Sequence, residues 1–198
     1  MPQPFNAAVM TNAGAALLTK AQAGQCTIEF TRMAIGNGSY STAEKETESL
    51  QKRTTLKSLK NSYTYSDLRV TSDRSVSVKA LLTNQDPVTL KTLITEGYYI
   101  TEVALFARPK GGGAEVMYAI AVTAGPTGDF MPPYNGFNPA EIIQEFLVTT
   151  NNSASVTIVR GGAALLAEDA NVIEDDVTRK RYRLGISSGN MYYEEEDE

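Results

Sequence analysis

The sequence predicts an α+β protein made mainly of antiparallel β-sheet, with an N-terminal helix and a C-terminal extension that ends in a β-hairpin. Apolar and polar residues alternate, at the period of two typical of strands, over much of residues 63–160. Residues 13–23 instead combine a capping residue with strong helix formers. Hydrophobic residues make up 42% and charged residues 21% of the 198 residues, the usage of ordinary globular proteins. We therefore expect one main domain over residues 1–165 and an extension over residues 166–198.

The N-terminal helix is predicted over residues 13–23. Thr11 or Asn12 can supply its N-cap, and Gly24 stands where a left-handed C-terminal cap is expected. The small alanine side chains allow this helix to lie close to a sheet or to a second chain.

A strand is predicted next, over residues 27–35. Its apolar residues change parity part-way along, so we expect a bulge at Thr31 or Arg32. The turn at residues 36–38, Gly-Asn-Gly, ends it. Residues 43–60 are polar, with acidic side chains leading and basic ones trailing, an order that favours a helix lying on the surface.

Period-two patterns then predict three antiparallel hairpins. Their strands are residues 63–70 with 76–82, residues 98–107 with 116–122, and residues 141–150 with 153–159. The run over residues 98–107 is apolar on both parities, so it should be buried on both faces and central in its sheet. Asn151 and Asn152 form the turn of the last hairpin.

The segment over residues 125–139 holds four of the eight prolines, so it can be neither a helix nor a central strand. Phe130, Met131, Tyr134 and Phe137 lie in this long loop and would be costly to leave in water. Two interpretations stay open: these side chains cover the edge of their own domain, or they contact a neighbouring subunit.

The C-terminal extension is predicted to be a tether, residues 166–181, followed by a hairpin. The candidate interface residues of this hairpin are Tyr182, Leu184, Ile186, Tyr192 and Tyr193. An isolated hairpin is not stable by itself, so this one should dock, either on its own chain or on another chain of an assembly.

Composition excludes several kinds of chemistry. The chain has no histidine, which rules out a Ser-His-Asp triad, a Cys-His dyad and His-ligated metals within it. The single cysteine, Cys26, can form neither an internal disulfide nor a zinc site. Glu141 and Glu145 lie about 13 Å apart along a strand, beyond the spacing of glycosidase carboxylates. We predict no catalytic residues, no cofactor and no metal.

Charge and hydropathy bear on partners. Residues 1–167 carry a net charge of +1, whereas residues 168–198 carry −6 and end in an acidic run. A nearly neutral body with an acidic end and no basic stripe is unsuited to nucleic acid. The N-terminus lacks the pattern of a signal peptide, and no apolar stretch is long enough to span a membrane. We expect no membrane insertion.

Several motifs resemble one family. Residues 11–18, Thr-Asn-Ala-Gly-Ala-Ala-Leu-Leu, and residues 30–38, Phe-Thr-Arg-Met-Ala-Ile-Gly-Asn-Gly, look like the opening of the phage tail-collar fibre family, the N-terminal region of tail fibres of contractile-tailed phages. Residues 99–107 resemble the family's central strand. Residues 118–121 and 156–158 are similar to strands that follow it.

The resemblance covers roughly residues 5–160 and implies a function. Family members usually continue into a fibre shaft and a receptor-binding tip, whereas this chain ends at residue 198. We therefore expect a structural protein of the virion tail or baseplate, in a phage or a related contractile injection particle, made in the bacterial cytoplasm. It would be a short adaptor between other baseplate proteins and a separate receptor-binding fibre. The resemblance also implies a homotrimer.

Two other functional classes stay open. A receptor- or carbohydrate-binding module at the tail tip would use exposed aromatic side chains such as those of Tyr134 and Phe137. An enzyme such as a depolymerase would need paired carboxylates in a cleft, which the sequence does not provide.

Overall fold

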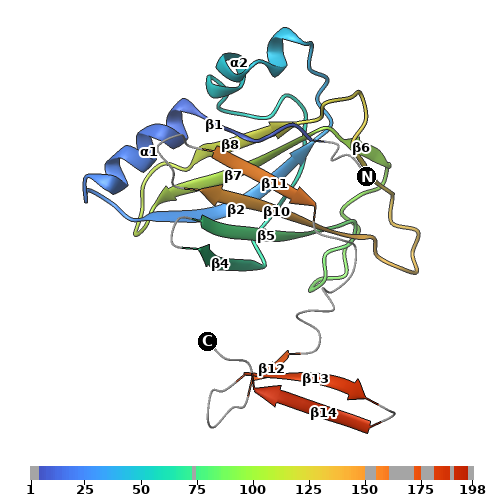
Figure 1. Cartoon of the computed structure of the whole chain (residues 1–198). Helices are drawn as coiled ribbons and strands as arrows, with labels where there is room; N and C mark the ends of the chain where they lie inside the picture. Colours follow the sequence, from blue (N-terminus) through green and yellow to red (C-terminus); the bar gives the residue numbers. More distant parts are fainter. Residues whose placement is uncertain are drawn as a thin grey trace. The chain divides into compact units, whose positions relative to one another are not determined.

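The computed structural model describes residues 5–72, 75–149, 155–160, 172–174, 181–187 and 190–195. The chain divides into two compact units, a body over Met1–Gly161 and a C-terminal unit over Gly162–Glu198 (Figure 1). Every strand pair in the described residues is antiparallel, and the helix near the N-terminus is present. The predicted fold class is confirmed.

The body contains two larger sheets and one short pair of strands. In spatial order, the five-stranded sheet consists of β1 (Val9–Met10), β8 (Val116–Val122), β7 (Glu102–Pro109), β2 (Ile28–Gly36) and β3 (Leu59–Tyr63). The four-stranded sheet consists of β11 (Ser155–Arg160), β10 (Glu141–Thr149), β5 (Ser75–Thr83) and β4 (Asp67–Ser72). The short pair is β6 (Tyr98–Ile100) with β9 (Asp129–Met131).

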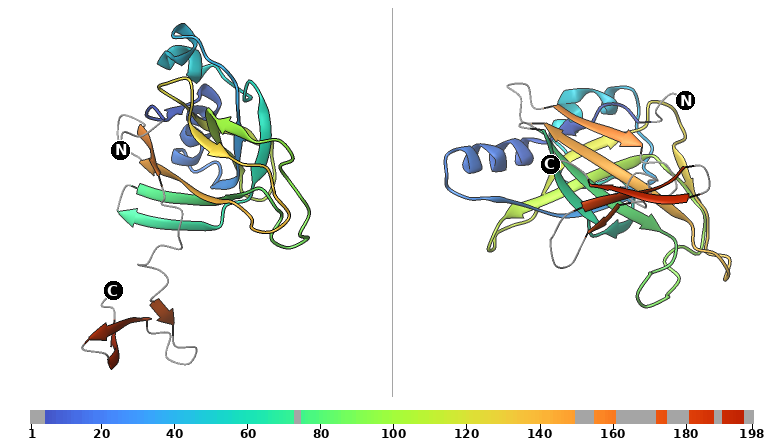
Figure 2. Two further views of the ribbon diagram at one scale, coloured as in Figure 1. Left: turned by 90° about the vertical axis from the view of Figure 1, so that its right-hand side faces the viewer. Right: turned by 60° about the horizontal axis from the view of Figure 1, so that its bottom comes forward.

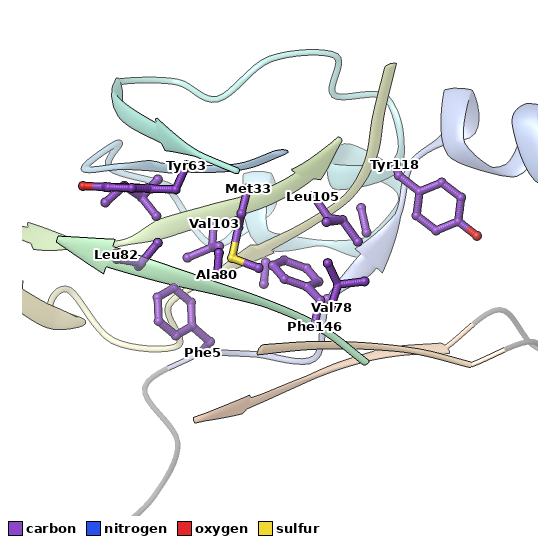
Figure 3. Close-up of a cluster of buried hydrophobic side chains, with 14 of the residues drawn as sticks. Phe5, Met33, Tyr63, Val78, Ala80, Leu82, Val103, Leu105, Tyr118 and Phe146 are labelled. Atoms are coloured by element: carbon purple, nitrogen blue, oxygen red, sulfur yellow. The ribbon is translucent and has the colours of Figure 1, made fainter. Parts of the chain in front are cut away.

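The two larger sheets pack face to face and enclose the main core. Met33 and Leu105 contribute from the five-stranded sheet, and Val78 and Phe146 from the four-stranded sheet, all fully buried (Figure 3). Strand β7 lies between β2 and β8, and six of its residues in succession are buried. The expectation of a central strand covered on both faces is confirmed for residues 102–107, whereas residues 98–100 form part of the separate β6–β9 pair, where Tyr99 is exposed.

The other face of the five-stranded sheet carries a second core. Ala104 and Ile120 pack there against Leu50, which lies in the short helix α2 (Thr47–Gln51). A single turn of 3₁₀ helix (Ala43–Lys45) precedes α2. In Figure 1, α2 lies above the sheet, on the side away from the four-stranded sheet.

The surface helix predicted over residues 43–60 is therefore wrong in its second half. Helix α2 ends at Gln51, and residues 59–63 form the edge strand β3. Between them, the backbone N–H groups of Lys57 and Ser58 donate hydrogen bonds to the carboxylate of Glu102. A helix continuing through residue 60 would use these N–H groups internally, so the distant carboxylate determines the conformation.

The first hairpin also differs from the prediction. Tyr63 belongs to β3 of the five-stranded sheet, and only residues 67–72 pair with β5. The other two hairpins are confirmed as β7 with β8 and β10 with β11. The predicted turn at residues 151–152 lies outside the described residues. The run over residues 98–107 is divided into β6 and β7 at Thr101, whose hydroxyl donates to the Gly38 carbonyl at 2.8 Å.

Helix α1 (Asn12–Gln22) is anchored at its N-terminus by Thr11, as expected for a cap. The Thr11 hydroxyl accepts a hydrogen bond from the Gly14 N–H at 3.0 Å and donates one to the Met117 carbonyl. The Thr11 N–H donates to the Tyr118 carbonyl at 3.0 Å. Gly24 has the expected left-handed conformation, with φ of +72°. One threonine thus caps the helix and attaches it to β8.

The predicted bulge in β2 is also confirmed, because its register against β7 shifts between Phe30 and Arg32. Phe30 therefore faces the main core, where its ring meets that of Tyr118 edge-on, with centroids 5.4 Å apart. Arg32 lies on the other face, 3.8 Å from the centroid of the Phe106 ring.

A buried carboxylate joins three segments of the body. Glu102, at the start of β7, is fully buried. Its Oε1 accepts from the N–H groups of Gly38 (3.0 Å) and Ser58 (2.7 Å), and its Oε2 accepts from the Lys57 N–H (2.9 Å) and the Tyr40 hydroxyl. Burial and the bond to Glu102 raise the pKa of Tyr40 above its usual value. Four donors thus compensate for the lost hydration of the carboxylate.

The C-terminal unit is a three-stranded sheet in the order β12 (Val172–Glu174), β13 (Arg181–Ser187) and β14 (Asn190–Glu195). The predicted hairpin corresponds to β13 and β14, and β12 is a strand that the sequence analysis did not foresee. Apart from β12 and Arg181, the predicted tether lies outside the described residues. No helix in the described part of the chain is both long and apolar enough to cross a membrane.

We predict that Glu102→Gln lowers the free energy of unfolding by about 3 kcal/mol. The amide NH₂ group replaces an oxygen that accepts two hydrogen bonds, so donors would face donors in a buried site. Glu29→Gln, which removes an exposed carboxylate paired with Arg108, is the matched control and should leave stability close to that of wild type. Denaturant titration measures both. Equal stability of the two variants would contradict the role of Glu102.

We also predict that Gly14→Ala destabilises the body. Alanine favours a helix by about 1 kcal/mol relative to glycine. At this position, however, a Cβ atom would lie 2.2 Å from the buried carbonyl oxygen of Tyr118, and overlaps of this kind cost at least about 1–3 kcal/mol. The melting temperature should fall, whereas Gly125→Ala, which meets nothing within 4 Å, should not lower it. A melting temperature raised by Gly14→Ala would show that α1 is not held against β8.

Candidate functional site

The proline-rich segment over residues 125–139 is only partly a loop, because it contains β9, which pairs with β6. Met131 is fully buried and packs in the main core, so for this candidate the interpretation of packing within its own domain holds and contact with a neighbouring subunit does not. Phe130 remains 49% exposed. Its ring lies 5.1 Å from that of Tyr99, its partner across the strands, which is also 49% exposed.

The other two predicted interface residues of this segment lie beyond β9. Tyr134 is half-buried, and its N–H donates to the Ile94 carbonyl at 2.9 Å. Phe137 is 86% exposed, at a turn where its own N–H is held by the side chain of Asn135. Tyr134 is thus attached to its own domain by its backbone, whereas Phe137 is almost fully exposed to solvent.

A second loop, residues 84–97, projects from the same end of the body as residues 132–140, as the views in Figures 1 and 2 show. It exposes further large apolar side chains. The Asp86 carboxylate accepts hydrogen bonds from the N–H groups of Thr89 and Val88, and these bonds lower the pKa of Asp86. Leu90 has a φ of +58°, a conformation that non-glycine residues adopt at a cost.

Asn84 joins the two loops. Only 1% of this residue is exposed, and its side chain donates to the Pro132 carbonyl (3.1 Å) and accepts from the Ala140 N–H (2.8 Å). The backbone carbonyl of Asn84 accepts hydrogen bonds from the N–H groups of Leu93 and Ile94 at 2.9 and 3.2 Å. The pattern in the sequence showed only that a strand ends here. It could not show the partners, which lie up to 56 residues away.

These two loops and the β6–β9 pair lie at one end of the body, which we call the apolar end (Figure 1). Its exposed side chains come from both loops and from the β6–β9 pair. They are Val88, Leu90, Leu93, Tyr99, Phe130 and Phe137. Contact between water and so many apolar side chains is unfavourable. Exposed apolar groups gathered in one region are typical of surfaces that bind another macromolecule.

The charged side chains at two pockets of the body take part in structural contacts. A pocket of about 240 Å³ lies beside Tyr40, but Lys45 at its wall donates to the Ala124 carbonyl at 2.9 Å. A second pocket of about 450 Å³ is lined by Glu29, Arg108 and Glu115, which take part in ion pairs of 2.8 Å. Within the described residues, no group of three or more Cys, Asp or Glu side chains is placed to hold a metal ion.

The candidate interface residues of the extension lie in the C-terminal unit. Tyr182 and Leu184 occupy β13, directly opposite Glu195 and Tyr193 of β14. Tyr192 is opposite Gly185, so its position falls on the other face of the sheet. The structure therefore separates the two adjacent tyrosines that the sequence analysis placed in one interface.

Comparisons with protein-family models, with curated proteins and with solved structures found no match for this chain. The resemblance to the tail-collar fibre family therefore rests on the motifs described above.

We predict that Asn84→Ala loosens the apolar end. The change leaves the Pro132 carbonyl and the Ala140 N–H without their partner, which costs about 1–3 kcal/mol for buried polar groups. Limited proteolysis should cut residues 85–97 and 132–139 faster than in wild type. Asn138→Ala, at an exposed position, is the control. Unchanged cleavage in the Asn84 variant would show that this residue does not hold the loops together.

Proposed function

We propose that this chain is a structural adaptor at the base of a tail fibre, in a phage or a related contractile injection particle. It would connect baseplate proteins with a receptor-binding fibre, in a symmetric assembly of three copies. The observation that carries the proposal is that residues of separate tail-collar-like motifs contact one another in the body.

The first such contact joins the N-terminal motif to the motif over residues 118–121. Gly14 lies so close to the Tyr118 carbonyl that it has no space for a side chain, and Thr11 bonds to the same stretch of β8. These contacts give a physical reason for the three-residue spacing between the threonine and the glycine in this chain.

The second contact joins the Gly-Asn-Gly motif to the motif over residues 99–107. A Cβ atom on Gly36 would lie 2.4 Å from Oε1 of Glu102, and one on Gly38 would lie 2.7 Å from the same atom. The Gly38 N–H also donates to that oxygen. The paired glycines and the glutamate thus form one structural element, and similarity at both places is similarity of a single framework. This favours common architecture over chance likeness of short motifs.

The apolar end supports the attachment role. An adaptor needs a surface that excludes water against another protein, and aromatic side chains supply such contacts. The Tyr99–Phe130 pair and the exposed ring of Phe137 are suited to this purpose. The three-copy stoichiometry follows from the family resemblance, because the base of a symmetric fibre shares the symmetry of what it carries.

A receptor- or carbohydrate-binding module remains the second candidate. The observation that favours it is the same exposed aromatic pair, since sugar rings stack on aromatic faces. Binding of the purified protein to a glycan array, abolished by replacing Tyr99 and Phe130, would support this function in place of attachment.

We predict that Val88→Ser combined with Phe137→Ser reduces the number of copies of this chain, and of the fibre, on purified particles at least severalfold. Both side chains are almost fully exposed, at 88% and 86%, so the fold should be unaffected. Val70→Ser, at 77% exposure on the edge strand β4, is the matched control. Quantitative mass spectrometry of particles measures the copy numbers. Particles that keep their fibres when this chain is deleted entirely would contradict the adaptor function.

A further inference from the structure

The C-terminal unit has a single layer within its described residues. Its three strands form one sheet, over a unit that spans Gly162–Glu198. Units below roughly 40 residues seldom fold without disulfides, metals or association. This unit contains neither cysteine nor histidine, so association is the remaining means of stabilising it.

The strand register places apolar residues on one face of this sheet. Residues directly opposite one another share a face, and successive residues alternate between faces. In β13 and β14, Leu184 is opposite Tyr193 and Ile186 is opposite Met191. One face therefore carries the positions of Ile173, Tyr182, Leu184, Ile186, Met191 and Tyr193. We call this the apolar face of the C-terminal unit.

The other face carries four of the five charged positions of the described strands, and these four are matched in pairs. Glu174 is opposite Arg181, and Arg183 is opposite Glu194. Opposite charges at directly paired positions stabilise a sheet. This face is therefore suited to water.

We propose that the apolar faces of C-terminal units from neighbouring copies of this chain pack against one another around the symmetry axis of the assembly. The packing would give each sheet the second layer that it needs. This inference rests on the three-copy assembly of the proposed function and names the surface that holds the copies together.

The distribution of charge favours a second copy as the occupant. Residues 168–198 carry a net charge of −6, yet among the described strand positions of the apolar face only Glu195, at the end of β14, is charged. Identical faces can therefore pack without enclosing like charges. A partner chosen for its basic side chains would find few acidic positions to bind on this face.

The size of the face also bears on the occupant. Strand spacings of about 4.8 Å and residue spacings of about 3.4 Å give a face of roughly 300 Å². Stable interfaces bury about 800 Å² on each partner, so the face alone would hold a free, unrelated protein weakly. Copies that stand together at one attachment point meet at high effective concentration, which makes a small face sufficient.

Salt distinguishes this arrangement from docking on a basic surface. Copies with a net charge of −6 in this region repel one another, so screening by salt should strengthen their association. Docking on a basic partner would weaken with salt. Sedimentation equilibrium of the full chain at low and high salt shows directly whether salt strengthens or weakens the association between copies.

The adjacent tyrosines provide a matched pair of variants. Tyr193→Asn introduces a polar group into the apolar face, whereas Tyr192→Asn makes the same change on the opposite face. We expect Tyr193→Asn to raise the dissociation constant of the oligomer by about tenfold or more, as for loss of an aromatic anchor. Tyr192→Asn should leave it within about twofold, and Leu184→Met, which keeps the face apolar, should preserve the oligomer.

Several results would overturn the inference. One is a free chain that stays monomeric up to about millimolar concentration, the effective concentration expected at a shared attachment point. Another is a Tyr193→Asn melting transition of the body below that of wild type, which would place the sheet on its own chain. Equal effects of the two tyrosine variants on the dissociation constant would show that the copies do not associate through the apolar face of the C-terminal unit. An oligomer that survives Tyr193→Asn and Ile173→Asn together would show that the body holds the copies. That last result leaves the adaptor function standing, because fibre retention on particles tests it separately.

Discussion

Burial of the Glu102 carboxylate is the constraint on which the arrangement of the body depends. A carboxylate on the central strand of the five-stranded sheet loses its hydration, and only donors brought by other segments can compensate for that loss. Gly38 and Tyr40 come from the segment after β2, and Lys57 and Ser58 from the segment before β3. The same contacts bring the intervening residues, with α2, over the outer face of the sheet, where they form the second core. One buried carboxyl group thus determines both the course of the chain and the segment that covers the outer face of the sheet.

Two apolar surfaces remain on this framework, and they differ in origin. The apolar end of the body is built from loops that Asn84 holds together, so its shape is established before any partner arrives. The apolar face of the C-terminal unit comes from simple alternation along three short strands. A surface whose loops are held by buried hydrogen bonds suits recognition of a different protein, whereas we propose that the alternating face packs against a copy of itself. An adaptor needs both kinds of contact, one toward its neighbours in the particle and one among its own copies.

The sequence predicted those features whose causes are local. The Thr11 cap, the left-handed Gly24, the bulge after Phe30 and the hairpin of β7 with β8 each follow from residues close to one another in the chain. Features that depend on distant partners were missed. The acidic-to-basic order of residues 43–60 predicted a long helix because nothing nearby reveals that Glu102 takes two of its N–H groups. The role of Met131 stayed open between covering its own domain and contacting a neighbour, because a proline-rich segment gives no sign of the short strand that turns this side chain inward. The hydrogen-bond partners of Asn84 likewise became visible only in the folded chain. The placement of Tyr192 and Tyr193 on opposite faces became visible only from the pairing register of β13 with β14.

The central claim, that this chain is a structural adaptor of a contractile particle, is tested most directly by locating it in the assembled particle. A cryo-electron microscopy reconstruction, combined with subunit counting by mass measurement, would do so. The account predicts that the body fits density at the point where the fibre meets the baseplate. It also predicts a copy number that is a multiple of three, with the apolar end against a neighbouring chain. Particles that contain their full set of fibres without any copy of this chain would contradict it.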